Sequence, residues 1–370
     1  MDKIYIEDCC EILDSMRIPI TASDREEGPY PYYGANGIQD HVADYIFDDE
    51  LVLLAEDGGN FGSKERPIAY RVSGKCWVNN HAHVLKPKEG LDVDYLCYSL
   101  MFYNVDGMVN GATRQKLTQA AMRKMMIPKR NLDEQKDIVN KLKKVVEIKR
   151  NRQIELEELD NLIKSRFVEL FGTLENPVQE FKKATLKELR NKITDGKHGG
   201  CIQEEGTERY FVGAREIYDD EVHYDTAPEI NVAEFEKDYR RCNIEIGDFL
   251  IVNTGATIGK SAIATDLRTE YTLLQKSVAL LKVKHELLNP VFLKWCYKVN
   301  TKMYMVESAS AQPNLLLSKI NATEIYVPDI ELQNQFALFV EQTDKLKFEV
   351  QKSLDETQKL MDSLMQQYFG

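Results

Sequence analysis

The feature that most constrains this chain is an internal repeat. Sliding the 370-residue sequence on itself by 198 positions aligns residues 113–172 with 311–370 without a gap. Identity between the copies is modest, but the apolar positions coincide, and identical pairs include Gln135 with Gln333 and Leu156 with Leu354. A repeat of this size means that one structural arrangement occurs twice, so any fold for this chain must contain two related halves.

Each copy also carries apolar residues at alternating steps of four and three over about five heptads. This spacing is typical of a coiled coil and predicts one long helix over 133–170 and a second over 331–368, neither interrupted by Pro or Gly. A helix of roughly 55 Å is unstable alone, because its apolar seam needs a partner. We expect the two seams to pack against each other, through Leu142, Val145, Leu156, Leu159 and Ile163 in the first helix and Val340, Val350, Leu354, Met361 and Leu364 in the second. Two unrelated surface helices on one core would leave the unbroken register unexplained.

A segment of different character precedes each helix. Both segments contain short apolar or aromatic runs separated by turn signals, which is typical of strands. We expect strands near 51–55, 68–72, 76–78 and 82–86 in the first segment, strands near 210–213, 249–252, 262–264 and 277–283 in the second, and a helix after each set, at 92–103 and 289–300. The sequence therefore predicts an α+β protein, with mixed β-rich domains at 1–131 and 173–330 and long helical segments at 132–172 and 331–370.

Composition limits the classes of function. The 48 Lys and Arg against 60 Asp and Glu give a net charge of −12, so a nucleic-acid site would have to be a local basic surface. Seven cysteines without a C-x-x-C pair indicate neither a disulfide framework nor a zinc knuckle, and they fit a reducing cytoplasm. The sequence MDKIYIEDCC lacks the pattern of a signal peptide, and no run of about 18 apolar residues occurs, so we expect a chain that is neither exported nor bound to a membrane.

Two motifs resemble catalytic or metal sites. The segment 255–261 (GATIGKS) is similar to a phosphate-binding P-loop, but three residues separate its glycines where that loop has four, and a strand-like run follows. His81 and His83 would share one face of a strand, as a zinc site can require, but no ligand stands beside them in sequence, so a packed or hydrogen-bonded pair is favoured. We expect no metal. There is no G-x-S-x-G motif, and no Asp/Asn-Pro-Pro-Tyr/Phe motif for adenine methylation. The chain is predicted to read a ligand, not to catalyse a reaction.

Polar and basic residues in the loops are the remaining candidates. Lys and Arg neutralise phosphates, and Asn, Gln, Arg and Lys can hydrogen-bond to purine edges in the major groove. The DNA-binding candidates are Asn60, Lys64, Arg66, Asn79, Asn80, His81, Arg114 and Lys116 in the first half, and Lys197, His198, Arg215, Thr257, Lys260, Gln275, Lys276, Gln312 and Asn314 in the second.

Several motifs in fixed order resemble the specificity subunit of type I restriction-modification enzymes, over nearly the whole chain. They are Tyr32-Tyr33-Gly34-Ala35-Asn36-Gly37-Ile38, Ile193-Thr194-Asp195-Gly196-Lys197-His198-Gly199, Asn253-Thr254-Gly255 with Gly259, Ala311-Gln312-Pro313-Asn314-Leu315, Leu332-Gln333-Asn334-Gln335-Phe336 and the two Phe-Gly endings. The chain departs from the pattern at Arg114-Gln115-Lys116-Leu117, where the second copy has Gln-Pro-Asn-Leu.

The resemblance implies two target recognition domains, each reading half of an interrupted double-stranded DNA sequence. It also implies an antiparallel helix pair that acts as a spacer and docks two methyltransferase (modification) subunits, with motor-nuclease (restriction) subunits joining the complex. S-adenosylmethionine, ATP and Mg²⁺ would then belong to the partner subunits and not to this chain. Antiparallel helices would relate the domains by a pseudo-twofold axis that matches the dyad of duplex DNA. The alternative is a coiled-coil scaffold whose globular domains bind protein or peptide and have no DNA specificity.

Overall fold

The computed structural model describes residues 2–111, 114–303 and 314–370. The chain divides into two compact units: the first contains Met1–Gln153 and Lys352–Gly370, and the second contains Ile154–Gln351. Each unit holds one of the two segments that precede a long helix, together with half of each long helix. The domain boundaries expected from the sequence stay a prediction, because the units cut through both helices.

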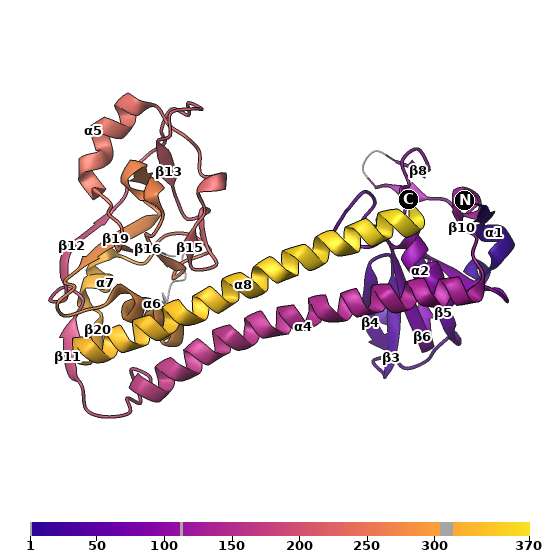
Figure 1. Ribbon diagram of the computed structural model, residues 1–370, viewed down its shortest axis with the longest axis horizontal. Helices are drawn as coiled ribbons and strands as arrows, with labels where there is room; N and C mark the ends of the chain where they lie inside the picture. Colours follow the sequence, from indigo (N-terminus) through magenta and orange to yellow (C-terminus); the bar gives the residue numbers. More distant parts are fainter. Residues whose placement is uncertain (1, 112–113, 304–313) are drawn as a thin grey trace. The chain divides into compact units, whose positions relative to one another are not determined.

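The two long helices are α4 (Leu132–Phe171) and α8 (Ile330–Phe369), each 40 residues long and unbroken (Figure 1). Their bounds differ by exactly the 198 residues of the repeat, and they extend the helices predicted from the heptad spacing by one residue at each end. No helix in the described part of the chain is both long and apolar enough to span a membrane.

The first unit is built on a six-stranded sheet with the strand order β2-β7-β5-β6-β3-β4. Neighbouring strands are antiparallel except β3 and β6, which are parallel. The helix α2 packs against β5 and β6. The sheet strands are β2 (Cys10–Ile12), β3 (Tyr30–Gly34), β4 (Gly37–Val42), β5 (Phe47–Ala55), β6 (Ala69–Val78) and β7 (Ala82–Pro87). The other elements are β1 (Lys3–Tyr5), α1 (Ile6–Cys9), α2 (Val93–Met101), β8 (Val109–Asn110), β9 (Lys116–Leu117), α3 (Gln119–Arg123) and β10 (Met126–Pro128).

The sequence prediction differs from the first unit in two places. The strands expected at 68–72 and 76–78 are one strand, β6, because Ser73 and Gly74 keep their pairing with β5 without a register shift. The hairpin of β3 and β4 was not predicted from apolar alternation. Its turn ends at Gly37, whose φ of +109° is a conformation that favours glycine.

The second unit contains a four-stranded antiparallel sheet with the order β12-β19-β16-β17. Its strands are β12 (Arg190–Asp195), β16 (Phe249–Val252), β17 (Ser261–Ile263) and β19 (Val278–Val283). The other elements are β11 (Lys182–Thr185), β13 (Tyr210–Val212), β14 (Ile217–Tyr218), β15 (Glu221–Val222), α5 (Val232–Cys242), β18 (Thr272–Leu274), α6 (Pro290–Val299), α7 (Leu317–Ala322) and β20 (Glu324–Val327). A strand follows the two glycines at 255 and 259, as expected, where a P-loop would have a helix.

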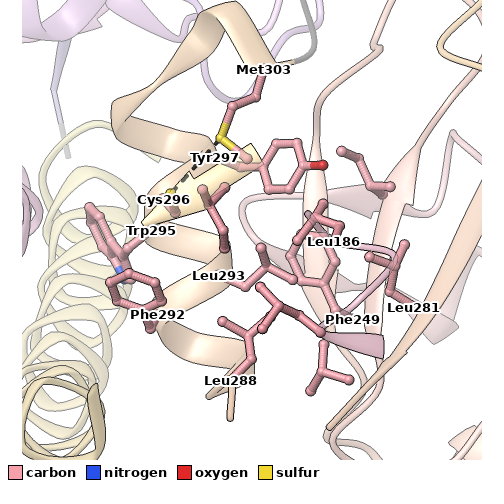
Figure 2. Close-up of a cluster of buried hydrophobic side chains, with 14 of the residues drawn as sticks. Leu186, Phe249, Leu281, Leu288, Phe292, Leu293, Trp295, Cys296, Tyr297 and Met303 are labelled. Atoms are coloured by element: carbon pink, nitrogen blue, oxygen red, sulfur yellow. Dashed lines mark hydrogen bonds between the residues drawn. The ribbon is translucent and has the colours of Figure 1, made fainter. Parts of the chain in front are cut away.

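The core of the second unit forms where α6 meets the sheet. Figure 2 shows Leu293 and Tyr297 of α6 facing Phe249 and Leu281 of the strands, with Met303 beside Cys296. Phe292 extends this core to the long helices, since its ring centroid lies 4.9 Å from that of Phe171 at the end of α4. Phe336 of α8 belongs to the same cluster, with its ring centroid 5.6 Å from that of Phe171, so aromatic residues join α6 to both long helices.

In each unit the halves of α4 and α8 run antiparallel. In the first unit Lys149 Nζ donates to Gln358 Oε1 at 2.5 Å, while Arg130, just before α4, donates to the carbonyl of Tyr368 at 3.4 Å. In the second unit Lys347 Nζ lies 2.7 Å from Asp160 Oδ1. Residues later in α4 therefore contact residues earlier in α8, as antiparallel packing requires. All ten seam residues named from the sequence are buried or half-buried.

Candidate nucleic-acid interface

Three segments of the first unit meet where β5 ends. The backbone amides of Glu56 and Asp57 donate to the carbonyl of His81, at 2.9 and 3.3 Å, and the amide of Leu117 donates to the carbonyl of Glu56 at 2.7 Å. We call residues 56–58, 79–81 and 114–117 the first corner. It gathers five of the predicted DNA-binding residues: Asn79, Asn80, His81, Arg114 and Lys116.

The side chains of the first corner form a charged network. Arg114 Nε lies 2.8 Å from Asp57 Oδ1, and His81 Nδ1 lies 3.4 Å from Asp57 Oδ2. The Arg114 side chain remains 59% exposed, so the carboxylate orients a guanidinium that solvent can reach. Lys116 Nζ lies 3.1 Å from Glu56 Oε1 and is half exposed. The corner therefore presents two cations in fixed directions.

Two of the corner's asparagines have different roles. Asn79 is only 3% exposed, donates to Gln39 Oε1 at 3.1 Å and accepts the His81 amide at 2.8 Å. Asn79 therefore shapes the loop from inside, whereas Asn80 is exposed. The other candidates of the first unit lie in the following loop, where Asn60 is half-buried and Lys64 and Arg66 are exposed.

A buried ionic cluster lies beneath the first corner, and sequence analysis did not find it. His83 is fully buried, with Nδ1 2.7 Å from Asp14 Oδ2 and Nε2 2.9 Å from the carbonyl of Leu117. Arg17 Nη1 donates to Glu56 Oε2 at 2.5 Å. Burial opposes ionisation of Asp14, but hydrogen bonds from His83 and Gln119 hold the pKa of that carboxyl below its usual value. No local pattern marks this cluster, because the side-chain contacts of Glu56 and His83 join residues 27 to 69 positions apart.

The same cluster shows how His81 and His83 are arranged. His81 precedes β7, so the alternation of a strand does not apply to it, and its ring faces Asp57 while His83 faces Asp14. Asp14, Glu56 and His83 bring possible ligand atoms within 4.8 Å of one another. However, the Arg17 guanidinium contacts both carboxylates and supplies the positive charge that a metal would. The hydrogen-bonded arrangement favoured from the sequence fits these contacts better than a zinc site.

The second unit repeats the backbone of the corner, with neutral side chains at Asn253, Thr254 and Asn314 where the first has Glu56, Asp57 and Lys116. The amide of Leu315 donates to the carbonyl of Asn253 at 2.7 Å, and the amide of Asn253 donates to the carbonyl of Ser277 at 2.9 Å. Thr254 and Asn314 form a β-bridge, as Asp57 and Lys116 do in the first unit. We call residues 253–255, 275–277 and 314–315 the second corner. It contains the candidates Gln275, Lys276 and Asn314.

Beside the second corner, β12 ends in a charged turn. Gly196 is required there, because a Cβ would lie 2.1 Å from the carbonyl oxygen of Leu274. The Lys197 ammonium lies 2.7 Å from Asp238, and this hydrogen bond raises the pKa of Lys197. Burial raises the pKa of Asp195, but Arg241 and His198 outweigh it and hold that pKa below its usual value. Lys197 is thus engaged within the domain, while the His198 side chain is 54% exposed.

The remaining candidates of the second unit divide by exposure. Arg215, Lys260 and Lys276 are exposed, and Thr257 and Gln275 are half-buried. The Gln275 side chain packs over Gly213, where an added Cβ would lie 2.4 Å from Oε1. Gln312 lies outside the described residues.

Comparison with known proteins identifies the family. The model of the family "Type I restriction modification DNA specificity domain" matches residues 1–158 and 179–358. The chain belongs to this family. The two matched segments correspond to the two halves of the repeat and confirm the resemblance read from the sequence motifs.

Individual relatives agree with this assignment. The chain is 39% identical over 134 residues to a protein of Haemophilus influenzae provisionally named a type I restriction enzyme specificity subunit, S.HindORF215P. This alignment covers 36% of the chain and only about a third (34%) of the relative. Over its full length the fold is similar to that of a type I restriction-modification S subunit from M. genitalium, with a TM-score of 0.59, 16% identity and 96% of that chain covered. A second structure, from a study of complex assembly and conformational transition of the type I system, gives a TM-score of 0.59, 15% identity and 97% coverage.

Proposed function

We propose that this chain is the sequence-specific DNA-binding subunit of a type I restriction-modification complex. Each of its two recognition domains reads one half of a bipartite site through its corner and the neighbouring loops. The observation that carries the proposal is the pair of corners, in which one backbone arrangement presents Asp57, Arg114 and Lys116 in one unit and Thr254 and Asn314 in the other. Such a pair suits two readers with different half-sites.

The chain directs chemistry that partner subunits carry out. We infer that two methyltransferase subunits and the restriction subunits dock on it, and that S-adenosylmethionine, ATP and Mg²⁺ bind to those partners. The long helices support docking, because they leave apolar side chains exposed outside the seam, at Val146, Ile148 and Leu360 in the first unit and at Ile154, Leu162, Leu338, Leu346 and Phe348 in the second. Because its target is genomic or invading DNA, we place the complex in the cytoplasm.

Salt-dependent binding of duplex DNA tests this proposal against the scaffold alternative. The complex of this chain with its methyltransferase subunits is titrated onto duplexes that carry or lack the methylated sequence of its host, at several salt concentrations. A DNA reader loses affinity steeply as salt rises and keeps a preference for its own sequence. Binding without salt dependence or sequence preference would favour the scaffold.

Adenine methylation in the host identifies the sequence itself. Methylated adenines are mapped in the genome with and without the gene for this chain. We expect one interrupted motif to disappear when the gene is deleted and to return when it is restored. Methylation that is unchanged by the deletion would contradict the proposed function.

A further inference from the structure

A buried glutamine stands at the start of α4. Gln135 is 2% exposed, and its carboxamide makes three hydrogen bonds to backbone groups. Its Oε1 accepts the amide of Asp92 at 2.8 Å, and its Nε2 donates to the carbonyls of Gly90 and Arg130, both at 2.9 Å. One side chain therefore links the long helix, the turn before α2 and the segment that enters α4.

The same arrangement occurs at the start of α8. Gln333 is fully buried, and its Oε1 accepts the amide of Asn289 at 2.9 Å. Its Nε2 donates to the carbonyls of Leu287 and Pro328, at 3.1 and 2.8 Å. Every partner in this second set lies 197 or 198 residues after its counterpart in the first. The same contacts at both helix starts of the repeat indicate a defined role for the carboxamide.

Each glutamine hydrogen-bonds the residue that caps a helix of the recognition domain, α2 in the first unit and α6 in the second. The Asp92 side chain accepts the amide of Tyr95 at the start of α2, and the Asn289 side chain accepts the amide of Val291 at the start of α6. The helix α2 packs on β5 and β6, and α6 packs into the core of the second sheet (Figure 2). In each unit the long helix is therefore bonded to the cap of a shorter helix, and that helix packs on the sheet that carries the corner.

Only a carboxamide of this length satisfies all three partners. It must accept one hydrogen bond and donate two, and the two donors face carbonyl oxygens. A glutamate would set a carboxylate oxygen against those two carbonyls, and a methionine of similar length would remove all three hydrogen bonds from a buried position. Asparagine is one methylene shorter and cannot span the same distances.

We propose that Gln135 and Gln333 are positioning residues that fix the angle between each recognition domain and its long helix, and so set the gap between the two half-sites. This inference rests on the proposed function. A gap is defined by where two domains hold DNA. Apolar packing holds each domain against its helix, and in each unit one such carboxamide adds directional hydrogen bonds that fix the angle. Loss of the contact leaves the corner, and therefore the half-site sequence, unchanged, but lets the domain turn on its helix.

Methylation of a series of duplexes tests the proposal. The complex is assembled with wild-type chain, Gln135→Met or Gln333→Met, and the duplexes keep both half-sites while the gap is the natural one or is shorter or longer by one base pair. We expect the preference of the wild type for the natural gap to fall by about tenfold in each variant, which corresponds to 1.4 kcal/mol. The methylated half-sites should not change.

Thr343→Val is the matched control. Thr343 is also buried on α8 and donates from its hydroxyl, but its acceptor is the carbonyl of Phe339 in the same helix. This variant loses a buried hydrogen bond of the helix without releasing a domain. Its gap preference should equal that of the wild type. A loss of gap preference in Thr343→Val as large as in the glutamine variants would overturn the proposal, since general weakening would then suffice.

A distance measurement decides the matter where a variant has too little activity. Spin labels at the exposed positions Asp48, in β5, and Lys144, in α4, report the angle between the first recognition domain and its helix within the full-length chain. The distance distribution should broaden in Gln135→Met and in the milder Gln135→Asn, and stay narrow in Thr343→Val. Narrow distributions in both Gln135 variants, or folded variants with full gap preference, would refute the role of the glutamines. Failure of the proposed function would be distinct, because the wild type would then show no preference for any duplex.

Discussion

The two corners have the same backbone and different charge. In both, the strand end, the neighbouring loop and the segment before a buried leucine are joined by equivalent backbone hydrogen bonds, which end at Leu117 in one unit and at Leu315 in the other. In the first corner an ion pair joins Glu56 to Lys116, whereas the neutral Asn253 and Asn314 stand at the equivalent positions of the second. Because backbone bonds hold the shape, the side chains are free to differ.

The two corners also differ in the buried residues that support them. The first corner rests on the buried carboxylates of Asp14 and Glu56, whose negative charges must be compensated, and Arg17 contacts both. The second corner rests on Asn253, a neutral buried residue. The first unit is therefore expected to depend on buried ions for its stability at a place where the second does not.

Exchanging one recognition domain should change the recognised DNA sequence more than any single substitution. Replacing residues 1–131 by the equivalent domain of a relative should change one half of the methylated sequence completely and leave the other half as it was. Distant sites contribute almost independently, and each corner lies within one unit. Methylation sequencing of the chimera checks this outcome. A change in both halves, or in neither, would contradict two independent readers.

The sequence predicted the long helices better than the corners. Heptad spacing is a local signal, so the ends of α4 and α8 were predicted to within one residue. The contact of His83 with Asp14 joins residues 69 apart, and the Gln135 contacts join residues up to 45 apart. No periodicity connects such pairs, so a single sequence names candidates but cannot say which of them meet.

Burial also separates candidates that look alike in the sequence. Asn79 and Asn80 are adjacent amides, yet the first is inside the loop and the second outside it. Lys197 and Lys260 are both lysines in loops, but Lys197 is paired with Asp238. The deciding factor in each case is a partner brought by the fold, which the residue type does not reveal.

Removing the buried carboxylate of the first unit should strongly lower its stability. Asp14→Asn removes one of the two carboxylates that contact Arg17 and the anionic partner of the buried His83, which is expected to cost about 3–5 kcal/mol at neutral pH. Signals of 5-fluorotryptophan at Trp77 and Trp295 report the unfolding of the first and second units separately, and only the first should shift. The matched control Asp225→Asn removes a partner of Arg268 whose side chain is 94% exposed, and should change stability by less than about 1 kcal/mol.

The loss of stability caused by Asp14→Asn should also depend on pH. The pKa of Asp14 is lowered in the folded chain, so its stabilising effect is fully present above the unfolded pKa of about 3.9. As pH falls below that value and through the folded pKa, the wild type loses this contribution, and the two stabilities should converge. An equal deficit at pH 7 and near pH 3 would show that the ionised carboxylate is not the source of the effect.

A smaller loss is expected from the helix seam. Leu354 is 8% exposed and Leu360 is 50% exposed, and both belong to the α8 half in the first unit. Leu354→Ala should cost about 2–3 kcal/mol, since it removes a buried side chain, and Leu360→Ala should cost less than about 0.5 kcal/mol. Denaturant unfolding followed at Trp77 measures both. Equal losses would mean that the seam does not stabilise this unit.

Arg114 of the first corner is expected to determine base specificity. Arg114→Ala is expected to cost about 1–3 kcal/mol in binding and to relax one position of the first half-site, because an oriented guanidinium can make paired hydrogen bonds to guanine. Methylation of duplexes with each single substitution in the first half-site is the measurement. Positions of the second half-site serve as the internal control. A uniform loss at every position would assign Arg114 to phosphate contact instead.

The smallest effect is expected at Lys260, in the loop that follows the second corner. Its side chain is exposed and makes no ion pair with the described residues, so it offers a positive charge that no partner holds in a fixed direction. Such a charge suits a phosphate, and Lys260→Ala should weaken binding about equally for all sequences while reducing the salt slope by about one unit. Titrations at four salt concentrations measure the slope, and Lys197→Ala is the comparison, since Lys197 already pairs with Asp238 and should change the slope less. If Lys260→Ala altered the preferred bases and left the slope unchanged, the second domain would read its half-site through this loop, and the equivalence of the two corners as reading surfaces would fail.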